Sequence, residues 1–192
     1  MSTDLKFQEL REEVFDLDEH NEYLDDFVCL AEEQALSEYI QGDASRDQIE
    51  QLTKVYLIFA LENGKKKLVA YYTLKAMSYA QRDYDSNGTK TIPCIEIAQI
   101  AVDSKYRGAH IATNLFFENI LPKALEVSRL IGCKAMFVFS LNEHSSRFYD
   151  SLGFEKVAGW SAEDGYGAIA VADDGYNNGL DIMIYPLTNL TL

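Results

Sequence analysis

The stretch Ile95–Leu115, IEIAQIAVDSKYRGAHIATNL, decides the fold of this chain. An apolar run typical of a strand ends at Asp103, and an Arg107-Gly108 pair then leads into an amphipathic helix. The first backbone N–H groups of a helix lack partners and carry partial positive charge, so a phosphate group binds well there. Lys105 and Arg107 add full positive charges, and glycine lets the backbone turn closely. The stretch therefore predicts an anion site between a strand and a helix.

The segments that follow sharpen this prediction. KAMFVFS at Lys134–Ser140 indicates a buried strand, and NEHSSRFYDSLGF at Asn142–Phe154 indicates a short helix that ends at Gly153. Together with VDSKYRGAHIA, these motifs resemble the GNAT superfamily of acyl-CoA-dependent N-acyltransferases over Tyr56–Val157. The resemblance implies the GNAT fold, an α/β (α+β) arrangement whose central sheet of about six or seven strands is mixed, mostly antiparallel and flanked by helices. It also implies acetyl-CoA as the cosubstrate.

The loop before the long helix carries the most specific part of the resemblance. In GNAT proteins it follows the pattern Arg or Gln, two residues, Gly, one residue, Gly or Ala. Arg107 and Ala112 match the ends of that pattern, and His110 replaces the first glycine. His110 either weakens or alters cofactor binding, or points to solvent and offers only its backbone N–H. The resemblance assigns cofactor binding to the whole loop, which consists of Arg107, Gly108, Ala109, His110, Ile111 and Ala112.

The strand before this loop has a second implied role. In GNAT proteins the pantetheine arm of the cofactor lies along the strand that matches Ile97–Val102. Backbone N–H groups of Ile100, Ala101 and Val102 would then bind the arm and stabilise the oxyanion of the transition state. One such donor contributes about 2.7–4 kcal/mol in a well-studied hydrolase. The apolar pattern also fits an ordinary buried central strand, and both interpretations can hold together.

Tyr149 is the candidate for proton transfer. It lies seven residues after Asn142, as in GNAT proteins, where this tyrosine protonates the departing thiolate of CoA and the asparagine helps to hold the cofactor. A phenol with a reference pKa of about 10 keeps its proton near neutral pH and can donate it to sulfur. The alternative is a tyrosine that packs in the core on one face of a helix.

The general base has several candidates. Glu96 matches a position where some GNAT enzymes carry a catalytic carboxylate, and strand alternation places it on one face with Ala98 and Ile100. Glu143 and His144 are further candidates, although an acidic residue at a helix start often only stabilises the helix. Many GNAT enzymes use a chain of water molecules in place of one base.

The length predicts a single domain over residues 1–192, and the resemblance implies that it is a GNAT domain. No apolar run approaches the roughly 18 residues that cross a membrane, and the first residues, MSTDLKFQELREE, are charged, so a cytoplasmic protein without membrane contact is expected. The three cysteines have no paired metal spacing and are expected to be reduced. GNAT proteins are often dimers, so a homodimer is one expected state.

The negative charge is concentrated at the N-terminus. Residues 1–50 contain 16 Asp and Glu against 3 Lys and Arg, a net charge of −13, and residues 51–192 contain 15 against 14, a net of −1. Apolar residues at helical spacing within 1–50 predict an acidic helical region. In GNAT proteins the first two helices form one wall of the acceptor site. An acidic wall favours a cationic amine and disfavours a polyanion.

Other segments agree with the GNAT order of elements. Two strands are expected at Val55–Leu61 and Leu68–Leu74, joined by a hairpin at Asn63-Gly64. A polar loop is expected at Ala80–Thr91, and Pro122 is expected to kink or divide the long helix.

The C-terminal part carries a Gly/Asp-rich insertion at residues 159–180, before a last strand at Asp181–Leu187. A long irregular segment in a compact domain usually has a function or is mobile. Trp160, Tyr166 and Tyr176 either line an acceptor pocket or belong to a surface hairpin.

Three functions remain open. The first is acetyl transfer to the primary amine of a small molecule or peptide. The second follows from a local resemblance of LVAYYTLKAMSY and the motifs above to GNAT-type toxins that acetylate aminoacyl-tRNA, although a tRNA binder needs basic patches and the triplet Lys65–Lys67 is small. The third is a non-catalytic binding protein in which His110 has spoiled the cofactor loop.

Overall fold

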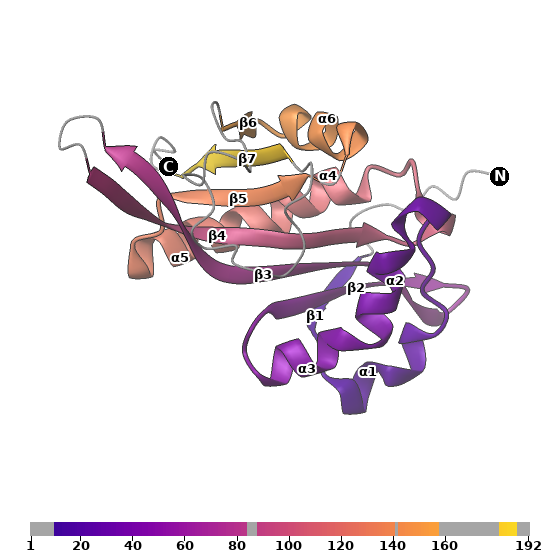
Figure 1. Ribbon diagram of the computed structural model, residues 1–192. Coiled ribbons are helices and arrows are strands. Elements are labelled where there is room, and N and C mark those ends of the chain that lie inside the picture. The colour runs from indigo at the N-terminus through magenta and orange to yellow at the C-terminus, as the bar shows by residue number, and fades with distance from the viewer. Residues whose placement is uncertain (1–9, 84–87, 141, 158–180, 188–192) are drawn as a thin grey trace. The chain divides into compact units, whose positions relative to one another are not determined.

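The structure is a computed structural model that describes residues 10–83, 88–140, 142–157 and 181–187. The described strands are β1 (Arg11–Val14), β2 (Lys54–Glu62), β3 (Lys65–Asp83), β4 (Gly88–Val102), β5 (Ala135–Ser140), β6 (Glu155–Lys156) and β7 (Asp181–Pro186) (Figure 1). The described α-helices are α1 (Leu17–Leu24), α2 (Gln34–Gln41), α3 (Asp43–Ile49), α4 (Ile111–Leu115), α5 (Leu121–Ile131) and α6 (Glu143–Ser151). Short 3-10 turns span Ala31–Glu33 (η2) and Ser104–Tyr106 (η3), and a π-helical turn spans Phe116–Ile120 (η4).

The strands are hydrogen-bonded in the order β1-β2-β3-β4-β5-β7-β6. Strand β5 pairs with β4 in parallel, while the pairs β1–β2, β2–β3, β5–β7 and β6–β7 are antiparallel. The predicted mixed, mostly antiparallel sheet is therefore confirmed. No helix in the described ranges is both long and apolar enough to span a membrane.

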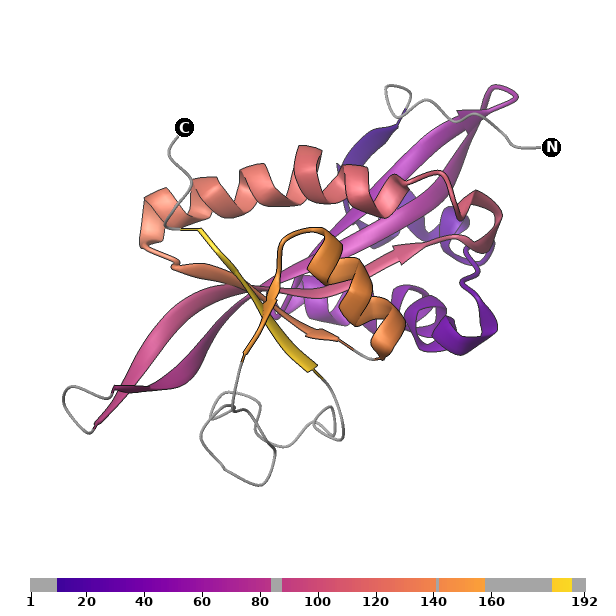
Figure 2. The ribbon, with the colours of Figure 1, turned by 90° about the horizontal axis from the view of Figure 1, so that it is seen from above.

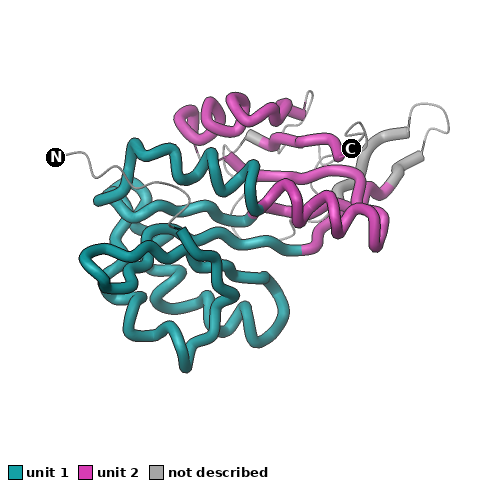
Figure 3. Tube along the Cα trace, turned by 180° about the vertical axis from the view of Figure 1, so that it is seen from behind, with its two compact units in different colours: residues 1–75, 98–119 teal, residues 76–97, 120–192 magenta. Residues whose placement is uncertain are grey.

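The chain divides into two compact units, which Figure 3 colours separately. Unit 1 comprises Met1–Lys75 and Ala98–Asn119, and unit 2 comprises Ala76–Ile97 and Ile120–Leu192. Each unit has its own apolar cluster. In unit 1, Phe27 of the segment after α1 and Ile40 of α2 belong to one cluster with Leu57, Phe59 and Tyr71 of β2 and β3. In unit 2 the cluster consists of Ile92, Cys94, Ala135, Phe137 and Ile182.

Local sequence signals predicted several elements correctly. The β2–β3 hairpin turns at Asn63 and Gly64, whose φ angles of +52° and +76° suit the Asn-Gly pair. The long helical run, drawn in salmon in Figure 2, changes its hydrogen bonding near the predicted point. The π-helical turn directly precedes α5, and Pro122 lies in the first turn of α5. Proline lacks the N–H that an uninterrupted helix would use, so the ladder of hydrogen bonds changes at this point.

Two predictions were wrong. The described part of residues 80–91 is strand and not a polar loop, because β3 continues to Asp83 and β4 already begins at Gly88. Strand pairing joins backbone groups, so a polar composition does not prevent it. The acidic region 1–50 is not purely helical either, since Arg11–Val14 forms β1 against residues Tyr56–Phe59 of β2. The four residues of β1 are too few for the alternation of polar and apolar side chains to identify a strand from the sequence. The 159–180 insertion lies outside the described residues, and so does any role of its aromatic residues.

A partly buried polar cluster fastens β1 to the rest of unit 1. The Tyr72 hydroxyl donates to Glu12 Oε2 at 2.6 Å, and Asn119 Nδ2 donates to the same oxygen at 2.7 Å. The Tyr72 ring stacks on Tyr56 with centroids 4.8 Å apart. Burial, together with the Glu12 carboxylate, raises the pKa of Tyr72. One carboxylate thus joins an edge strand, a central strand and the helical run.

Replacing Tyr72 by Phe removes one hydrogen bond of this cluster. We expect Tyr72→Phe to lower the free energy of unfolding by about 1.5–3 kcal/mol, because the buried Tyr72 donates to a charged and partly buried acceptor. Urea unfolding followed by circular dichroism measures the change. Tyr23→Phe is the matched control, since the partly buried Tyr23 bonds the exposed side chain of its neighbour Glu22. Equal losses in the two variants would contradict a special role for the Glu12 cluster.

The same variant has a predicted pH dependence. Unfolded tyrosine has a pKa of about 10, and the pKa of folded Tyr72 is raised above it. The stability that this shift contributes is therefore complete below about pH 10 and is lost as the pH rises through the folded pKa. The difference in unfolding free energy between wild type and Tyr72→Phe should shrink above that pH. A difference that stays constant up to pH 11 would contradict the assignment.

Candidate functional site

The loop that connects β4 to α4 is anchored by Asp103, which is 2% exposed. Its Oδ1 accepts a hydrogen bond from the backbone N–H of Lys105 at 2.9 Å, and its Oδ2 accepts one from that of Val28 at 3.0 Å. Its own N–H donates to the carbonyl of Val69 at 2.9 Å, and the N–H of Ser104 donates to Val28 at 2.8 Å. The start of the loop is thus held on β3 and on the segment that follows α1.

The loop then turns through two left-handed residues. Gly108 has φ +81°, and His110 has φ +56° and ψ +22° as the N-cap of α4. His110 is exposed, and no side-chain cap accompanies it. Left-handed backbone favours glycine, so the chain keeps the turn that glycine would make at the place where the sequence departs from the GNAT pattern.

Arg107 forms an ion pair with Glu33 of η2. The two side chains are 32% and 21% exposed, so the pair is partly shielded from water. Sequence reasoning identified Arg107 but missed Glu33, because the two residues lie far apart in the chain and belong to separate local motifs. Only the folded chain brings this acid to the predicted anion loop.

The end of β4 lies in the interior of unit 1. Ala101 and Val102 are buried and Ile100 is partly buried, as both interpretations of this strand require. The Oε1 atom of Gln99 is buried and has no hydrogen-bond partner among the described residues, and the same holds for Oγ1 of Thr73 on β3. The strand that would carry an amide-containing ligand therefore presents an unsatisfied acceptor.

Tyr149 belongs to unit 2 and is buried on α6. Its ring makes edge contacts with Phe148 and Phe154, at centroid distances of 5.2 and 5.4 Å. Burial raises the pKa of its phenol. The group therefore holds its proton throughout the physiological range and can serve as an acid but not as a base.

Asn142 is the N-cap of the same helix. Its Oδ1 accepts from the N–H of Ser145 at 2.9 Å, while the Ser145 hydroxyl accepts from the N–H of Asn142 at 3.0 Å, which completes a capping box. The Oδ1 atom is thus committed to the helix. A hydrogen bond from the Asn142 side chain to a cofactor would therefore use Nδ2 as the donor.

The candidates for the general base differ in burial. Glu96 is 5% exposed on β4, in register with Phe137 of β5. Glu143 is exposed and forms a salt bridge with Arg147 at 3.1 Å, and His144 is exposed. Glu96 therefore remains as the buried carboxylate among the three. The predicted loop residues lie together in unit 1, whereas Glu96, Asn142 and Tyr149 lie in unit 2.

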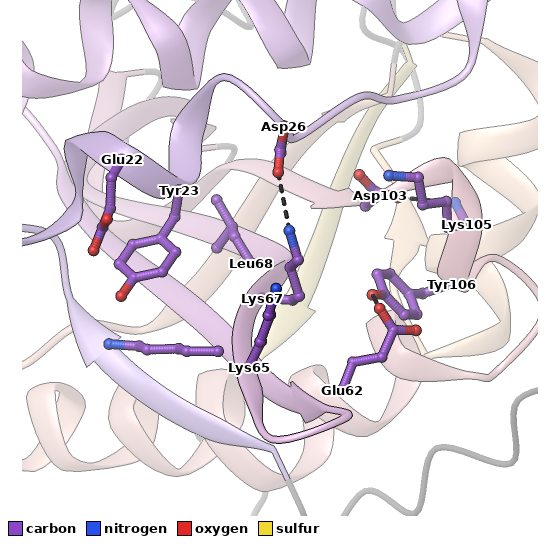
Figure 4. Close-up of a pocket in the computed structure, with 11 residues that line it drawn as sticks. Glu22, Tyr23, Asp26, Glu62, Lys65, Lys67, Leu68, Asp103, Lys105 and Tyr106 are labelled. Atoms are coloured by element: carbon purple, nitrogen blue, oxygen red, sulfur yellow. Dashed lines mark hydrogen bonds and ion pairs between the residues drawn. The ribbon is translucent and has the colours of Figure 1, made fainter.

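A pocket of about 210 Å³ lies in unit 1, between the end of α1, the β2–β3 hairpin and η3 (Figure 4). Lysines on its wall are held by acids of the N-terminal region: Lys67 pairs with Asp26 at 3.0 Å, and Lys66 pairs with Glu13 at 2.6 Å. Lys66 also lies 4.0 Å from the centre of the Phe59 ring. Two lysines of the triplet, Lys66 and Lys67, are therefore paired with acids of the N-terminal region.

A family model described as "Acetyltransferase (GNAT) family" matches residues 13–154. The chain belongs to the GNAT family. As a GNAT protein it is an acetyltransferase that uses acetyl-CoA, which confirms the family, the cosubstrate and the enzyme class predicted from the sequence.

Solved structures confirm the GNAT fold over nearly the whole chain. A tyrosine-to-phenylalanine mutant of the toxin AtaT, bound to the C-terminus of the antitoxin AtaR and acetyl-CoA, is 20% identical with a TM-score of 0.69 and covers 94% of each chain. AtaT complexed with acetyl-methionyl-tRNAfMet is 20% identical with a TM-score of 0.69, covering 93% of this chain and 95% of the other. A tyrosine-to-phenylalanine mutant of KacT is 19% identical with a TM-score of 0.70, covering 94% and 96%.

The left-handed backbone at His110 determines how substitutions there should change the stability of the protein. We expect His110→Gly to be neutral or to stabilise the protein by up to about 1 kcal/mol, because glycine adopts this backbone without steric cost. His110→Val should destabilise it by about 1–3 kcal/mol, because a β-branched residue is disfavoured at positive φ. Chemical unfolding compares the variants. Equal stability of the glycine and valine variants would show that the turn does not adopt this conformation.

Proposed function

We propose that this GNAT protein transfers the acetyl group of acetyl-CoA to the primary amine of a small cationic molecule or a peptide, directly and without an acyl-enzyme. The observation that carries the choice of acceptor is the charge around the anion loop. The N-terminal region has a net charge of −13, and its carboxylates neutralise the lysines beside the loop. Such a surface attracts a cationic amine and repels a polyanion.

The residues of unit 1 fit the cofactor. Pyrophosphate would bind to the loop Arg107–Ala112, where Gly108 and His110 turn the backbone and Arg107 supplies the charge. The pantetheine arm contains two amide groups, and the unsatisfied Gln99 Oε1 on β4 suits an amide N–H donor. Backbone N–H groups at Ile100, Ala101 and Val102 would stabilise the oxyanion that forms at the thioester.

When bound, acetyl-CoA supplies an activated thioester carbonyl. The amine attacks this carbonyl after losing a proton, and we assign that proton to Glu96, which is the buried carboxylate on β4. Tyr149 donates its phenolic proton to the departing sulfur, a role that suits a raised pKa. As the C–S bond breaks, the attacking nitrogen loses a second proton, which balances the proton that Tyr149 gives to the sulfur. The proton taken up by Glu96 is released to solvent, so a cationic amine yields the amide, CoA and one proton. We place the protein in the cytoplasm, where its cosubstrate acetyl-CoA is available. The three free cysteines agree with this location.

Aminoacyl-tRNA is the second candidate acceptor. It is favoured by the likeness to AtaT complexed with acetyl-methionyl-tRNAfMet, which extends over 93% of this chain. A toxin of that kind would also have an antitoxin as partner, as AtaT does in its complex with AtaR. The acidic N-terminal region opposes this candidate, because tRNA binding requires cations that replace phosphate counterions.

The two acceptors are separated by an activity assay at several salt concentrations. CoA release is measured with a polyamine, a lysine-containing peptide and methionyl-tRNA, each at roughly 50 and 200 mM salt. We expect activity on the amines with little dependence on salt. Activity on methionyl-tRNA alone, falling by an order of magnitude or more at the higher salt, would replace the first proposal by the second.

Tyr149→Phe tests the acid. We expect kcat to fall by about 10²-fold or more, because general acid catalysis contributes about 10²–10⁴-fold, while the Kd for acetyl-CoA changes by less than about threefold. Steady-state kinetics and calorimetric titration measure the two quantities. Tyr39→Phe is the control, since Tyr39 is hydrogen-bonded to Thr53 in unit 1. An unchanged kcat in Tyr149→Phe would remove this residue from the mechanism.

A further inference from the structure

We propose that Glu33 is a built-in competitor of the cofactor: its carboxylate occupies Arg107 and is displaced when the pyrophosphate of acetyl-CoA binds. The inference rests on the proposed role of Arg107 in binding pyrophosphate. It goes beyond that role, because it makes cofactor affinity a property of the N-terminal acidic region as well as of the loop.

The first argument is the way in which η2 is held beside the loop. Two backbone contacts fasten residue Val28 to the loop, one from its N–H to Asp103 Oδ2 at 3.0 Å and one from the Ser104 N–H to its carbonyl at 2.8 Å. The 3-10 turn that begins three residues later ends at Glu33. The anchored segment therefore delivers the Glu33 carboxylate to Arg107 whenever the fold is intact.

The second argument is that the two anions need the same donor group. The guanidinium has five N–H donors in one plane, and its Nη2 group contacts Glu33 Oε2, so a pyrophosphate that binds at this edge needs the donor that Glu33 holds. A second anion at the fork would lie within a few ångströms of the first, where like charges repel strongly in a partly shielded site. Pyrophosphate and the Glu33 carboxylate therefore compete for the Nη2 edge of Arg107.

The third argument concerns Glu33 once it is displaced. Its Oε2 atom is buried and has no hydrogen bond among the described residues, so the ion pair with Arg107 is what compensates its charge. A buried carboxylate without a partner is costly, and the side chain must then move into water. Cofactor binding thus releases η2 from the loop, while the backbone contacts of Val28 hold the segment before it.

The test compares Glu33→Gln with Glu32→Gln, an exposed acid on the same turn. Calorimetry with acetyl-CoA should show that Glu33→Gln binds about three- to tenfold more tightly than wild type, as expected when a competing ion pair is removed. Glu32→Gln should change the affinity by less than about twofold, because its carboxylate acts only at a distance. Equal effects of the two variants would overturn the proposal, since they would indicate a general charge effect.

A second ligand isolates the pyrophosphate. S-acetyl-pantetheine contains the thioester and the arm but no pyrophosphate, so its affinity should be the same for wild type and Glu33→Gln. Tighter binding of this ligand to the variant would contradict competition at Arg107. In the wild-type protein, hydrogen exchange of amides in residues 31–33 should become faster when acetyl-CoA is added. Slower exchange there would also overturn the proposal, without relying on any variant.

Arg107→Gln separates this inference from the proposed function. If acetyl-CoA binds Arg107→Gln as tightly as wild type, the assignment of pyrophosphate to Arg107 is wrong and the competition fails with it. If Arg107→Gln binds more weakly but Glu33→Gln does not bind more tightly, the loop assignment stands and the competition alone is wrong. The expected double variant, Glu33→Gln with Arg107→Gln, binds no more tightly than Arg107→Gln.

Discussion

The buried carboxylate of Asp103 is the constraint on which the rest of unit 1 depends. It accepts backbone hydrogen bonds from Lys105 in its own loop and from Val28 in a distant segment. A carboxylate with these bonds is compensated for its burial, and it fixes both segments at one point. The left-handed turn at Gly108 and His110 begins from this anchor, and so does the approach of Glu33 to Arg107.

Several carboxylates of the N-terminal region have partners within the protein. Glu12 accepts from Tyr72, Glu13 from Lys66 and His20, and Asp26 pairs with Lys67. His20 is 2% exposed, and its Nδ1 accepts from the N–H of Asp16, so the proton lies on Nε2, which donates to Glu13. The net charge of −13 thus comes from two kinds of acid: those that form hydrogen bonds and ion pairs within the protein, and those that make its surface negative.

His110 shows how a departure from a family pattern can leave the backbone unchanged. The sequence indicates that a side chain has replaced glycine in the cofactor loop, and the structure shows that the backbone keeps a left-handed conformation there with the side chain exposed. Histidine is among the residues that tolerate this region better than most, so the cost is small beside that of a β-branched residue. The N–H groups of the loop can then remain directed as in a glycine-containing loop.

The sequence by itself determined the family, the cosubstrate, the strand-loop-helix order around Arg107, the Asn63-Gly64 hairpin and the interruption at Pro122. These depend on periodicity, turn residues and helix signals within a few positions of one another. Only the tertiary structure decided that Arg11–Val14 pairs with β2, that residues 80–91 are mostly strand, and that Glu33 occupies Arg107. These features join backbone or charged groups that are distant in sequence, and their pairing depends on the packing of the whole unit rather than on any local pattern.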